Sequence, residues 1–302
     1  MSPPESGFAN WIRPHAVSAI RALPRVRGRG RLAKMCNDAL LSAGANPVTR
    51  VKMAAGHSLL LDTRLFSHCM ALYSGVIGLE DLFTPLVSLL KPGGVALDVG
   101  ANIGAVSTPL GLAAKRIGAR VISFEPFPKN AEWLRQNLQL NQVEDVVTVV
   151  NCGLSSAPGE ATLLLREDFE TGAGIGNASV AEPGIDERFE KATIQLNTLD
   201  DLWPSFGSPR VDIVKIDIEG HEDRFFLGAK QTLALHRPAI VIEVNRPLYT
   251  QRGLDFNTAI PRSLPPDYRY FIPGPTEIKD LAECHHSDVL LVPAEKAAQL
   301  RA

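Results

Sequence analysis

Between residues 95 and 244 the chain alternates short apolar runs with longer stretches whose apolar residues recur at helical spacing. Short apolar runs of this kind are typical of strands buried on both faces of a sheet. Strands that alternate with helices form a mostly parallel sheet with helices on both faces, so we predict an α/β fold. The expected strands are 95–99, 121–124, 146–150, 161–165, 193–196, 211–216, 239–244, 268–272 and 288–292, and the expected helices are 104–117, 128–140 and 221–235.

Residues 1–91 precede this alternation, and we assign them to an N-terminal extension of helices and a hairpin, followed by a main domain over 92–302. The hairpin is expected at 48–62, where two apolar runs flank a glycine-containing turn. Leucines at helical spacing predict a helix over 79–90. Residues 166–192 lack periodicity, and a loop of this length is usually functional or disordered, so we expect a mobile flap or a disordered segment there.

The N-terminal extension contains a strongly basic stretch at residues 13–34, which has no acidic side chain. One interpretation is a surface arm that contacts anionic lipid headgroups or an anionic substrate carrier. The other is a solvated, partly disordered leader. Pro24, Gly28 and Gly30 argue against a continuous helix through the stretch. Its basic residues are Arg13, Arg21, Arg25, Arg27, Arg29, Arg31 and Lys34.

The rest of the composition points to a cytoplasmic protein. The four cysteines lie far apart and form no C-x-x-C pair, which argues against a disulfide framework and a structural zinc site. No run approaches the ~18 apolar residues of a membrane-spanning helix. Arg13 and Pro14 interrupt the only early apolar patch, so we expect no signal peptide. The formal net charge of −2 gives no reason to expect nucleic acid as a partner.

A candidate cofactor site follows the first strand of the alternation. Gly100 can take the geometry of a tight strand-to-helix turn and allows a ligand close to the main chain. Asp98, just before the turn, suits a ligand that carries a cation or an amine. Glu125, at the end of the next strand, is placed to accept hydrogen bonds from both hydroxyls of a ribose, and Pro126 turns the chain away. The alternative is that Gly100 and Gly104 simply form a tight turn.

The loop itself distinguishes between nucleoside cofactors. Nicotinamide and flavin sites normally need Gly-x-Gly-x-x-Gly, whose second glycine makes room for a pyrophosphate. This chain has Asn102 at that place. S-adenosylmethionine has no phosphate and carries a positive sulfonium and an ammonium group. The loop therefore favours S-adenosylmethionine over a dinucleotide.

Several runs resemble the FkbM-type methyltransferase family, which is part of the larger Rossmann-like group of S-adenosylmethionine-dependent methyltransferases. The most distinctive run is DIEGHE at 217–222, directly after a buried strand, and the resemblance covers roughly residues 50–293. It implies a seven-stranded sheet whose last strand is antiparallel, and methyl transfer to a hydroxyl of a sugar in a glycolipid, a polysaccharide or a secondary metabolite. The other matching runs are LDVGANIGAVS at 97–107, SFEPFPKNAEWLRQNLQLN at 123–141, TLDDL at 198–202, IVIEVN at 240–245 and SDVLLVP at 287–293.

Candidates for the chemistry follow the strand at 211–216. A methyltransferase aligns two reactants and removes a proton from the acceptor hydroxyl. His221 is the strongest candidate for the base, since an unperturbed imidazole titrates near pH ~6.5. Asp217 and Glu219 could bind the methionine amine, orient His221 or act as the base. A strand-to-helix connection whose carboxylates favour the helix start is the structural alternative.

Three other hypotheses stay open. Asp217, Glu243 and Asn245 end neighbouring strands, and their oxygen atoms could bind Mg²⁺. Lys215 could pair with Glu243 as readily as take part in catalysis. The chain could also be an NAD-type dehydrogenase, which Asn102 disfavours, or a non-catalytic scaffold with a cofactor fold, which the intact group of polar residues after the strand disfavours.

Overall fold

The computed structural model describes residues 7–24, 26–79, 81–166, 177–180 and 190–301. The chain divides into two compact units, an N-terminal unit (1–77 with 166–177) and a main unit (78–165 with 178–302). The division falls at residue 77 and not at 91, because Leu82, Leu86 and Leu90 belong to an apolar core of the main unit. The helix expected over 79–90 is the shorter α4, Phe83–Ser88.

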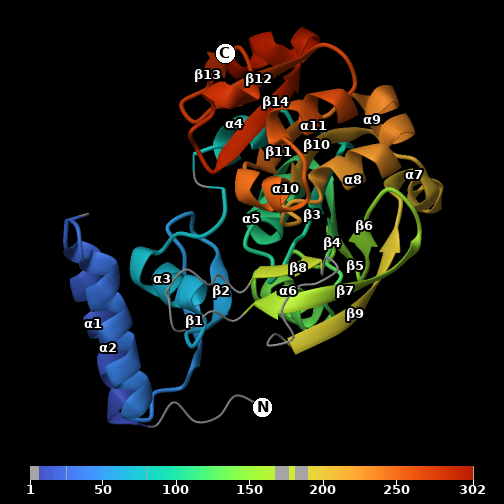
Figure 1. Ribbon diagram of the computed structural model, residues 1–302. Helices are drawn as coiled ribbons and strands as arrows, with labels where there is room; N and C mark the ends of the chain where they lie inside the picture. The colour runs from blue at the N-terminus through green and yellow to red at the C-terminus, as the bar shows by residue number, and fades with distance from the viewer. Residues whose placement is uncertain (1–6, 25, 80, 167–176, 181–189, 302) are drawn as a thin grey trace. The chain divides into compact units, whose positions relative to one another are not determined.

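The main unit is built on an eight-stranded sheet in the order β13-β12-β14-β11-β10-β3-β4-β5 (Figure 1). Its central strands are parallel, and β14 is antiparallel to β11. The predicted α/β sheet is confirmed, with the short β13 added beside β12 at one edge. The strands are β3 (Val95–Val99), β4 (Arg120–Phe124), β5 (Val147–Val150), β10 (Val211–Ile216), β11 (Ala239–Glu243), β12 (Tyr268–Ile272), β13 (Thr276–Ile278) and β14 (Asp288–Pro293).

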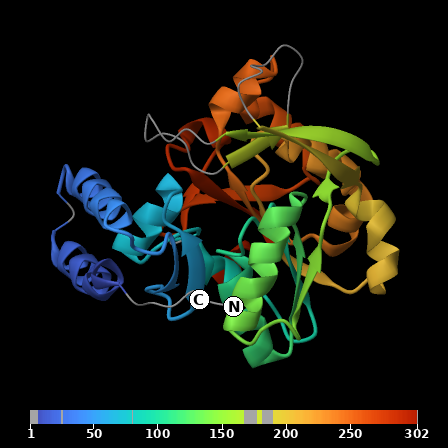
Figure 2. The ribbon, with the colours of Figure 1, turned by 90° about the horizontal axis from the view of Figure 1, so that it is seen from below.

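Helices cover both faces of this sheet (Figures 1 and 2). Successive strand residues point to opposite faces, so Leu97 and Val214 enter one apolar core while Ala96 and Ile213 enter the other. The first core is closed by α7 (Leu199–Leu202), α8 (Glu222–Gly228), α9 (Lys230–His236), α10 (Arg246–Gln251) and α11 (Phe256–Ser263). The second is closed by α4, α5 (Ser107–Ile117) and α6 (Pro128–Leu140).

The helix expected over 221–235 is interrupted between α8 and α9. Gly228 ends α8 where the chain meets Ser155, and a Cβ on Gly228 would clash with the Ser155 carbonyl oxygen. The close approach thus favours glycine, a poor helix former, at this point. The expected single helix is therefore two short ones.

A second sheet follows β5, in the order β6-β9-β7-β8. It consists of β6 (Gly153–Leu154), β7 (Gly159–Arg166), β8 (Asn177–Val180) and β9 (Glu190–Asn197). The stretch 166–192, expected to be a flap or a disordered segment, thus contains strand residues at 166, at 177–180 and at the start of β9. The rest of that stretch, 167–176 and 181–189, lies outside the described residues.

The N-terminal unit contains α1 (Phe8–Ala22), α2 (Arg29–Ser42), the hairpin β1–β2 and α3 (Phe66–Ser74). The predicted hairpin is confirmed, with Val48–Lys52 antiparallel to Ser58–Asp62. The prediction of a partly disordered basic leader is wrong for the described residues, because α1 and α2 pack on each other and on α3. None of the helices in the described part of the chain combines the length and apolar character needed to cross a bilayer.

Candidate active site

The loop after β3 and the loop after β10 meet at the carboxyl edge of the sheet. Gly100 has a left-handed backbone (φ +76°), and a Cβ there would clash with the carbonyl oxygen of Asp217. Only glycine meets both conditions without strain. The amides of Gly100 and Ala101 both donate to the carbonyl oxygen of Phe124, at 3.0 Å. Because β3 lies between β10 and β4, the predicted cofactor loop touches both of its neighbours.

Glu125 ties the cofactor loop to the end of β4. Its carboxylate accepts hydrogen bonds from the amide of Asn102 at 2.8 Å and from the amide of Phe127 at 3.0 Å. Burial raises the pKa of Glu125 to about 7. Asn102 itself adopts φ +49°, a conformation that asparagine tolerates better than most residues. A ribose contact of Glu125 stays a prediction, since both carboxylate oxygens already accept main-chain hydrogen bonds.

The turn after Glu125 has a partner that the sequence did not reveal. Asn151, directly after β5, donates from Nδ2 to the carbonyl oxygens of Glu125 at 2.7 Å and Pro126 at 3.0 Å. These bonds fix the direction in which the chain leaves β4. Gly104 (φ +89°) closes the loop on the other side, and a Cβ on it would clash with the Leu134 side chain of α6.

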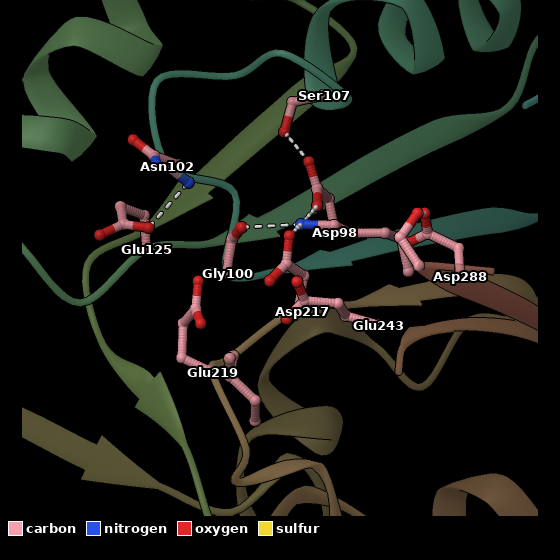
Figure 3. A network of polar contacts seen from close by, with 12 residues as sticks. Asp98, Gly100, Asn102, Ser107, Glu125, Asp217, Glu219, Glu243 and Asp288 are labelled. Atoms are coloured by element: carbon pink, nitrogen blue, oxygen red, sulfur yellow. Dashed lines mark hydrogen bonds and ion pairs between the residues drawn. The ribbon is translucent and has the colours of Figure 1, made fainter. Parts of the chain in front are cut away.

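Asp98 lies beneath the loop rather than on its surface. Its side chain is fully buried, and Oδ2 accepts a hydrogen bond from the Ser107 hydroxyl at 2.5 Å (Figure 3). Its other oxygen, Oδ1, lies 3.4 Å from the Lys215 ammonium. Asp98 therefore anchors the start of α5 and neutralises a buried cation. A direct contact between Asp98 and the cofactor stays a prediction.

Lys215 is the central residue that sequence reasoning left undecided. Its ammonium donates to the Gly100 carbonyl oxygen at 2.8 Å and lies 3.5 Å from Asp217 Oδ2. Burial opposes its charge, but the carboxylates of Asp98 and Asp217 outweigh that cost and hold the pKa of Lys215 above its usual value. The ion pairs in the described residues join Lys215 to these two aspartates, and not to Glu243 as the sequence allowed.

Three carboxylates gather just below Gly100 (Figure 3). Asp217, Glu219 and Glu243 each offer an oxygen atom within 4.8 Å of the other two. Asn245 donates from Nδ2 to Glu219 at 3.4 Å and to Glu243 at 3.5 Å. Burial, reinforced by the negative charges of Asp217 and Glu219, raises the pKa of Glu243 to about 9. Such a group could hold an ammonium ion, share a proton or bind a divalent cation.

The loop between β10 and α8, residues 217–221, contains Asp217 and Glu219, and we call it the acidic loop. It is braced from below by Glu222, which is fully buried. Its Oε1 accepts the amides of Ile218 at 3.3 Å and Gly220 at 3.2 Å, and its Oε2 accepts the hydroxyl of Tyr249 at 2.9 Å. Burial raises the pKa of Glu222 to about 7. Sequence reasoning missed this role, because Tyr249 lies 27 residues further along the chain.

The brace holds Glu219 in an unfavourable conformation. Glu219 has φ +54° and Gly220 has φ +84°. A left-handed backbone at a glutamate costs of the order of 1 kcal/mol and persists only where surrounding contacts impose it. Arg252 contributes to those contacts by binding the Gly220 carbonyl oxygen and the Asp223 carboxylate. His221 follows directly as the N-cap of α8, half-buried, and its role as a base stays a prediction.

A comparison with known protein families includes the residues at this edge of the sheet. Residues 98–277 match the sequence profile described as the methyltransferase FkbM domain, a span that runs from Asp98 past both loops of the site. This chain belongs to the FkbM methyltransferase family. The family resemblance inferred from DIEGHE and the glycine loop is thus confirmed.

Individual curated relatives match over part of their length. The chain is 32% identical over 161 residues to the methyltransferase sdnD of Sordaria araneosa, which covers 45% of this chain and 60% of that protein. It is 29% identical to the hexuronic acid methyltransferase AglP of Haloferax volcanii, covering 52% and 58%. It is also 29% identical to the 2-O-methyltransferase NoeI of Sinorhizobium fredii, covering 50% and 64%. The chain therefore spans about three fifths of the length of these relatives.

Among solved structures, the chain resembles the methyltransferase FkbM from Methylobacillus flagellatus. The TM-score is 0.43 at 19% identity, and the match covers 93% of this chain and 59% of the other. The fold assignment rests on the strand order given above, in which the antiparallel β14 lies between β11 and β12.

Proposed function

We propose that this FkbM-family protein transfers a methyl group from S-adenosylmethionine to a hydroxyl oxygen of a sugar. The observation that carries the proposal is the contact of two loops, in which Gly100 lies against the backbone of Asp217. This contact brings the glycine loop with Glu125 next to the acidic group of Asp217, Glu219 and Glu243. In this proposal, a nucleoside site and a cation-binding site adjoin at one edge of the sheet.

The residues at this edge fit the chemistry of S-adenosylmethionine. The cofactor carries two positive groups and no phosphate, and the described side chains around the loop are mainly acidic. Asn102 stands where a dinucleotide-binding loop has its second glycine, and its amide is engaged by Glu125. This arrangement disfavours the dehydrogenase alternative, which needs room for a pyrophosphate. We assign the adenosine to Glu125 and the loop 100–104, and the ammonium group to Asp217 or Glu219.

When bound, S-adenosylmethionine supplies an electrophilic methyl group and leaves as S-adenosylhomocysteine. The protein has to align the acceptor oxygen with the sulfur–methyl bond and remove the hydroxyl proton. We assign the proton to His221, which lies two residues beyond Glu219 on the same loop. The oxygen–carbon bond forms as the sulfur–carbon bond breaks, the electron pair of the broken bond stays on sulfur, and the proton moves to the imidazole.

The names of two relatives support the proposed acceptor class. One is a hexuronic acid methyltransferase and another a 2-O-methyltransferase. Together they support a sugar hydroxyl as the acceptor, carried by a glycolipid, a polysaccharide or a secondary metabolite.

The test is transfer of a deuterated methyl group from labelled S-adenosylmethionine to a panel of hexosides and hexuronic acid glycosides, followed by mass spectrometry and NMR of the product. We expect the label on oxygen. His221→Ala should lower turnover by about 10²–10⁴-fold with little change in S-adenosylhomocysteine affinity, whereas His285→Ala, at an exposed histidine, should leave both unchanged. Label on carbon or nitrogen would contradict O-methylation, and full turnover by His221→Ala would contradict the assigned base.

A further inference from the structure

The helices α1 and α2 and their connection carry exposed apolar side chains. Of the ten large hydrophobic residues that are exposed in the described part of the chain, six lie between residues 8 and 35. Phe8 is 75% exposed and Trp11 65%, and their rings stack at a centroid distance of 5.9 Å. Solvent-exposed side chains of this size are normal singly but unusual as a group, and grouped ones mark interaction surfaces.

The connection between the two helices combines such residues with positive charge. We call this surface the α1–α2 tip and define it by its exposed side chains. They are Leu23, Val26, Arg27, Arg31 and Leu32. Gly28, with φ +98°, turns the chain from α1 into α2 within the tip. The helices lie side by side, so both ends of the connection contribute to one place (Figures 1 and 2).

The basic residues of this stretch divide into two groups. Arg13, Arg21 and Arg29 are used inside the unit, since their guanidinium groups donate to the carbonyl oxygens of Asn46, Leu72 and Tyr73, respectively. Arg27 and Arg31 are exposed on the tip. The sequence contains no acidic residue from position 6 to position 37, so no carboxylate of that stretch neutralises the tip.

This combination selects one class of partner. Arginines alone would suit any polyanion, but a polyanion gains nothing from Val26 and Leu32 beside them. A second copy of the same tip would cover the apolar groups while bringing like charges together, which costs free energy. Anionic lipid accommodates both the apolar side chains and the arginines, because the apolar side chains enter the boundary of the acyl chains while the arginines stay with the headgroups.

We propose that the α1–α2 tip binds the surface of a bilayer that contains anionic phospholipid. Val26 and Leu32 would enter the interface between headgroups and acyl chains, and Arg27 and Arg31 would contact headgroup phosphates. The attachment is reversible and peripheral. This inference is independent of the proposed methyl transfer, because it involves no residue of the site around Gly100.

Vesicle co-sedimentation of the full chain tests the proposal. The vesicles are phosphatidylcholine alone, or phosphatidylcholine with about a third phosphatidylglycerol, each at low and high salt. The charge variant is Arg27→Glu/Arg31→Glu, and the apolar variant is Val26→Ser/Leu32→Ser. The matched control is Arg116→Glu/Arg120→Glu, which makes the same charge change at two exposed arginines of the main unit. Circular dichroism of each variant checks that it is folded.

We expect binding to the anionic vesicles only, weakened by high salt. The charge variant should bind at least tenfold more weakly, given the contribution of each arginine near an anionic surface, and the apolar variant should also bind more weakly. The control should bind like the unmodified chain. The proposal would be overturned by absence of binding to anionic vesicles, by equal binding of the charge variant, or by sedimentation velocity showing a dimer that the apolar variant dissolves while vesicles bind nothing.

Discussion

The ammonium group of Lys215, on strand β10, donates a hydrogen bond of 2.8 Å to the main-chain carbonyl oxygen of Gly100, which follows the neighbouring strand β3. The same ammonium neutralises Asp98, which is fully buried under the loop. The cofactor loop thus rests on a buried cation and its carboxylate partner. This relationship explains why a lysine can occupy a strand whose other residues are almost all apolar.

Lys215→Met should destabilise the main unit, because it leaves the carboxylate of Asp98 buried without its partner. Removing one member of a buried pair costs about 3–5 kcal/mol. The double variant Asp98→Asn/Lys215→Met removes both charges and should recover part of that loss. Urea unfolding of the three proteins measures this difference. Equal stability of the single variant and the unmodified protein would show that the pair does not hold the loop.

Tyr249→Phe tests the brace beneath the acidic loop. The variant removes the hydrogen bond to Glu222 at 2.9 Å and leaves a buried carboxylate less well satisfied. We expect a loss of about 1–3 kcal/mol in stability and a lower kcat, with the affinity for S-adenosylhomocysteine nearly unchanged. Tyr270→Phe on β12 is the matched control, since this tyrosine packs at the periphery of the same core. An unchanged kcat in Tyr249→Phe would show that the hydrogen bond between Tyr249 and Glu222 does not contribute to catalysis.

Glu243→Gln should change how stability depends on pH. The pKa of Glu243 is raised to about 9 in the folded protein, against about 4.3 in an unfolded chain. Between these values the folded state holds a proton that the unfolded state has lost, so the contribution of Glu243 to stability falls as the pH rises from about 4 toward 9. The Glu243→Gln variant has no carboxylic acid at this position and so lacks this pH-dependent loss of stability. Its melting temperature relative to that of the unmodified protein should therefore increase from pH 5 to pH 8. An equal difference at both pH values would contradict the raised pKa.

The same group of acids gives a prediction about metal. Lys215 shares its positive charge between Asp98 and Asp217, and a protonated Glu243 removes one negative charge from the group, so the three carboxylates can coexist without a metal ion. We therefore expect protein treated with EDTA and dialysed to retain methyl transfer, and added Mg²⁺ to change turnover by less than about twofold. Loss of turnover after chelation, restored by Mg²⁺, would instead identify Asp217, Glu219 and Glu243 as metal ligands.

The parts of the fold that sequence reasoning located correctly are those fixed by local pattern. The strand Val95–Val99 has five buried residues in a row, and such a run indicates a central strand without further information. Gly100 and Glu125 were recognisable because each follows a strand directly. Lys215 looked ambiguous for the opposite reason. Its partners Asp98 and Gly100 lie more than 100 residues earlier, and only the pairing of β10 with β3 brings them together.

The contacts around the acidic loop also join residues that lie far apart in the sequence, so local sequence patterns do not predict them. Glu222 and Tyr249 belong to α8 and α10, and neither the charge of one nor the aromatic ring of the other indicates that they meet. The break between α8 and α9 depends on the approach of Ser155 to Gly228, which helical periodicity does not contain. The strand at 177–180 has only four residues, of which Val180 is the only large apolar one, and it forms through pairing within the second sheet.

Titration calorimetry with S-adenosylhomocysteine measures whether the edge formed by Gly100, Asn102 and Glu125 binds S-adenosylmethionine. We predict a measurable heat with this ligand and none with NAD⁺. The affinity should fall as the pH drops below 7, because protonation of Glu125, whose pKa is about 7, removes an acceptor that the ribose needs. At pH 6 the loss should be about tenfold.

Glu125→Gln should bind more weakly at pH 8 and lose the pH dependence, whereas Glu132→Gln, at an exposed glutamate of α6, should match the unmodified protein. Absence of heat with S-adenosylhomocysteine, together with binding of NAD⁺, would contradict binding of S-adenosylmethionine at this edge.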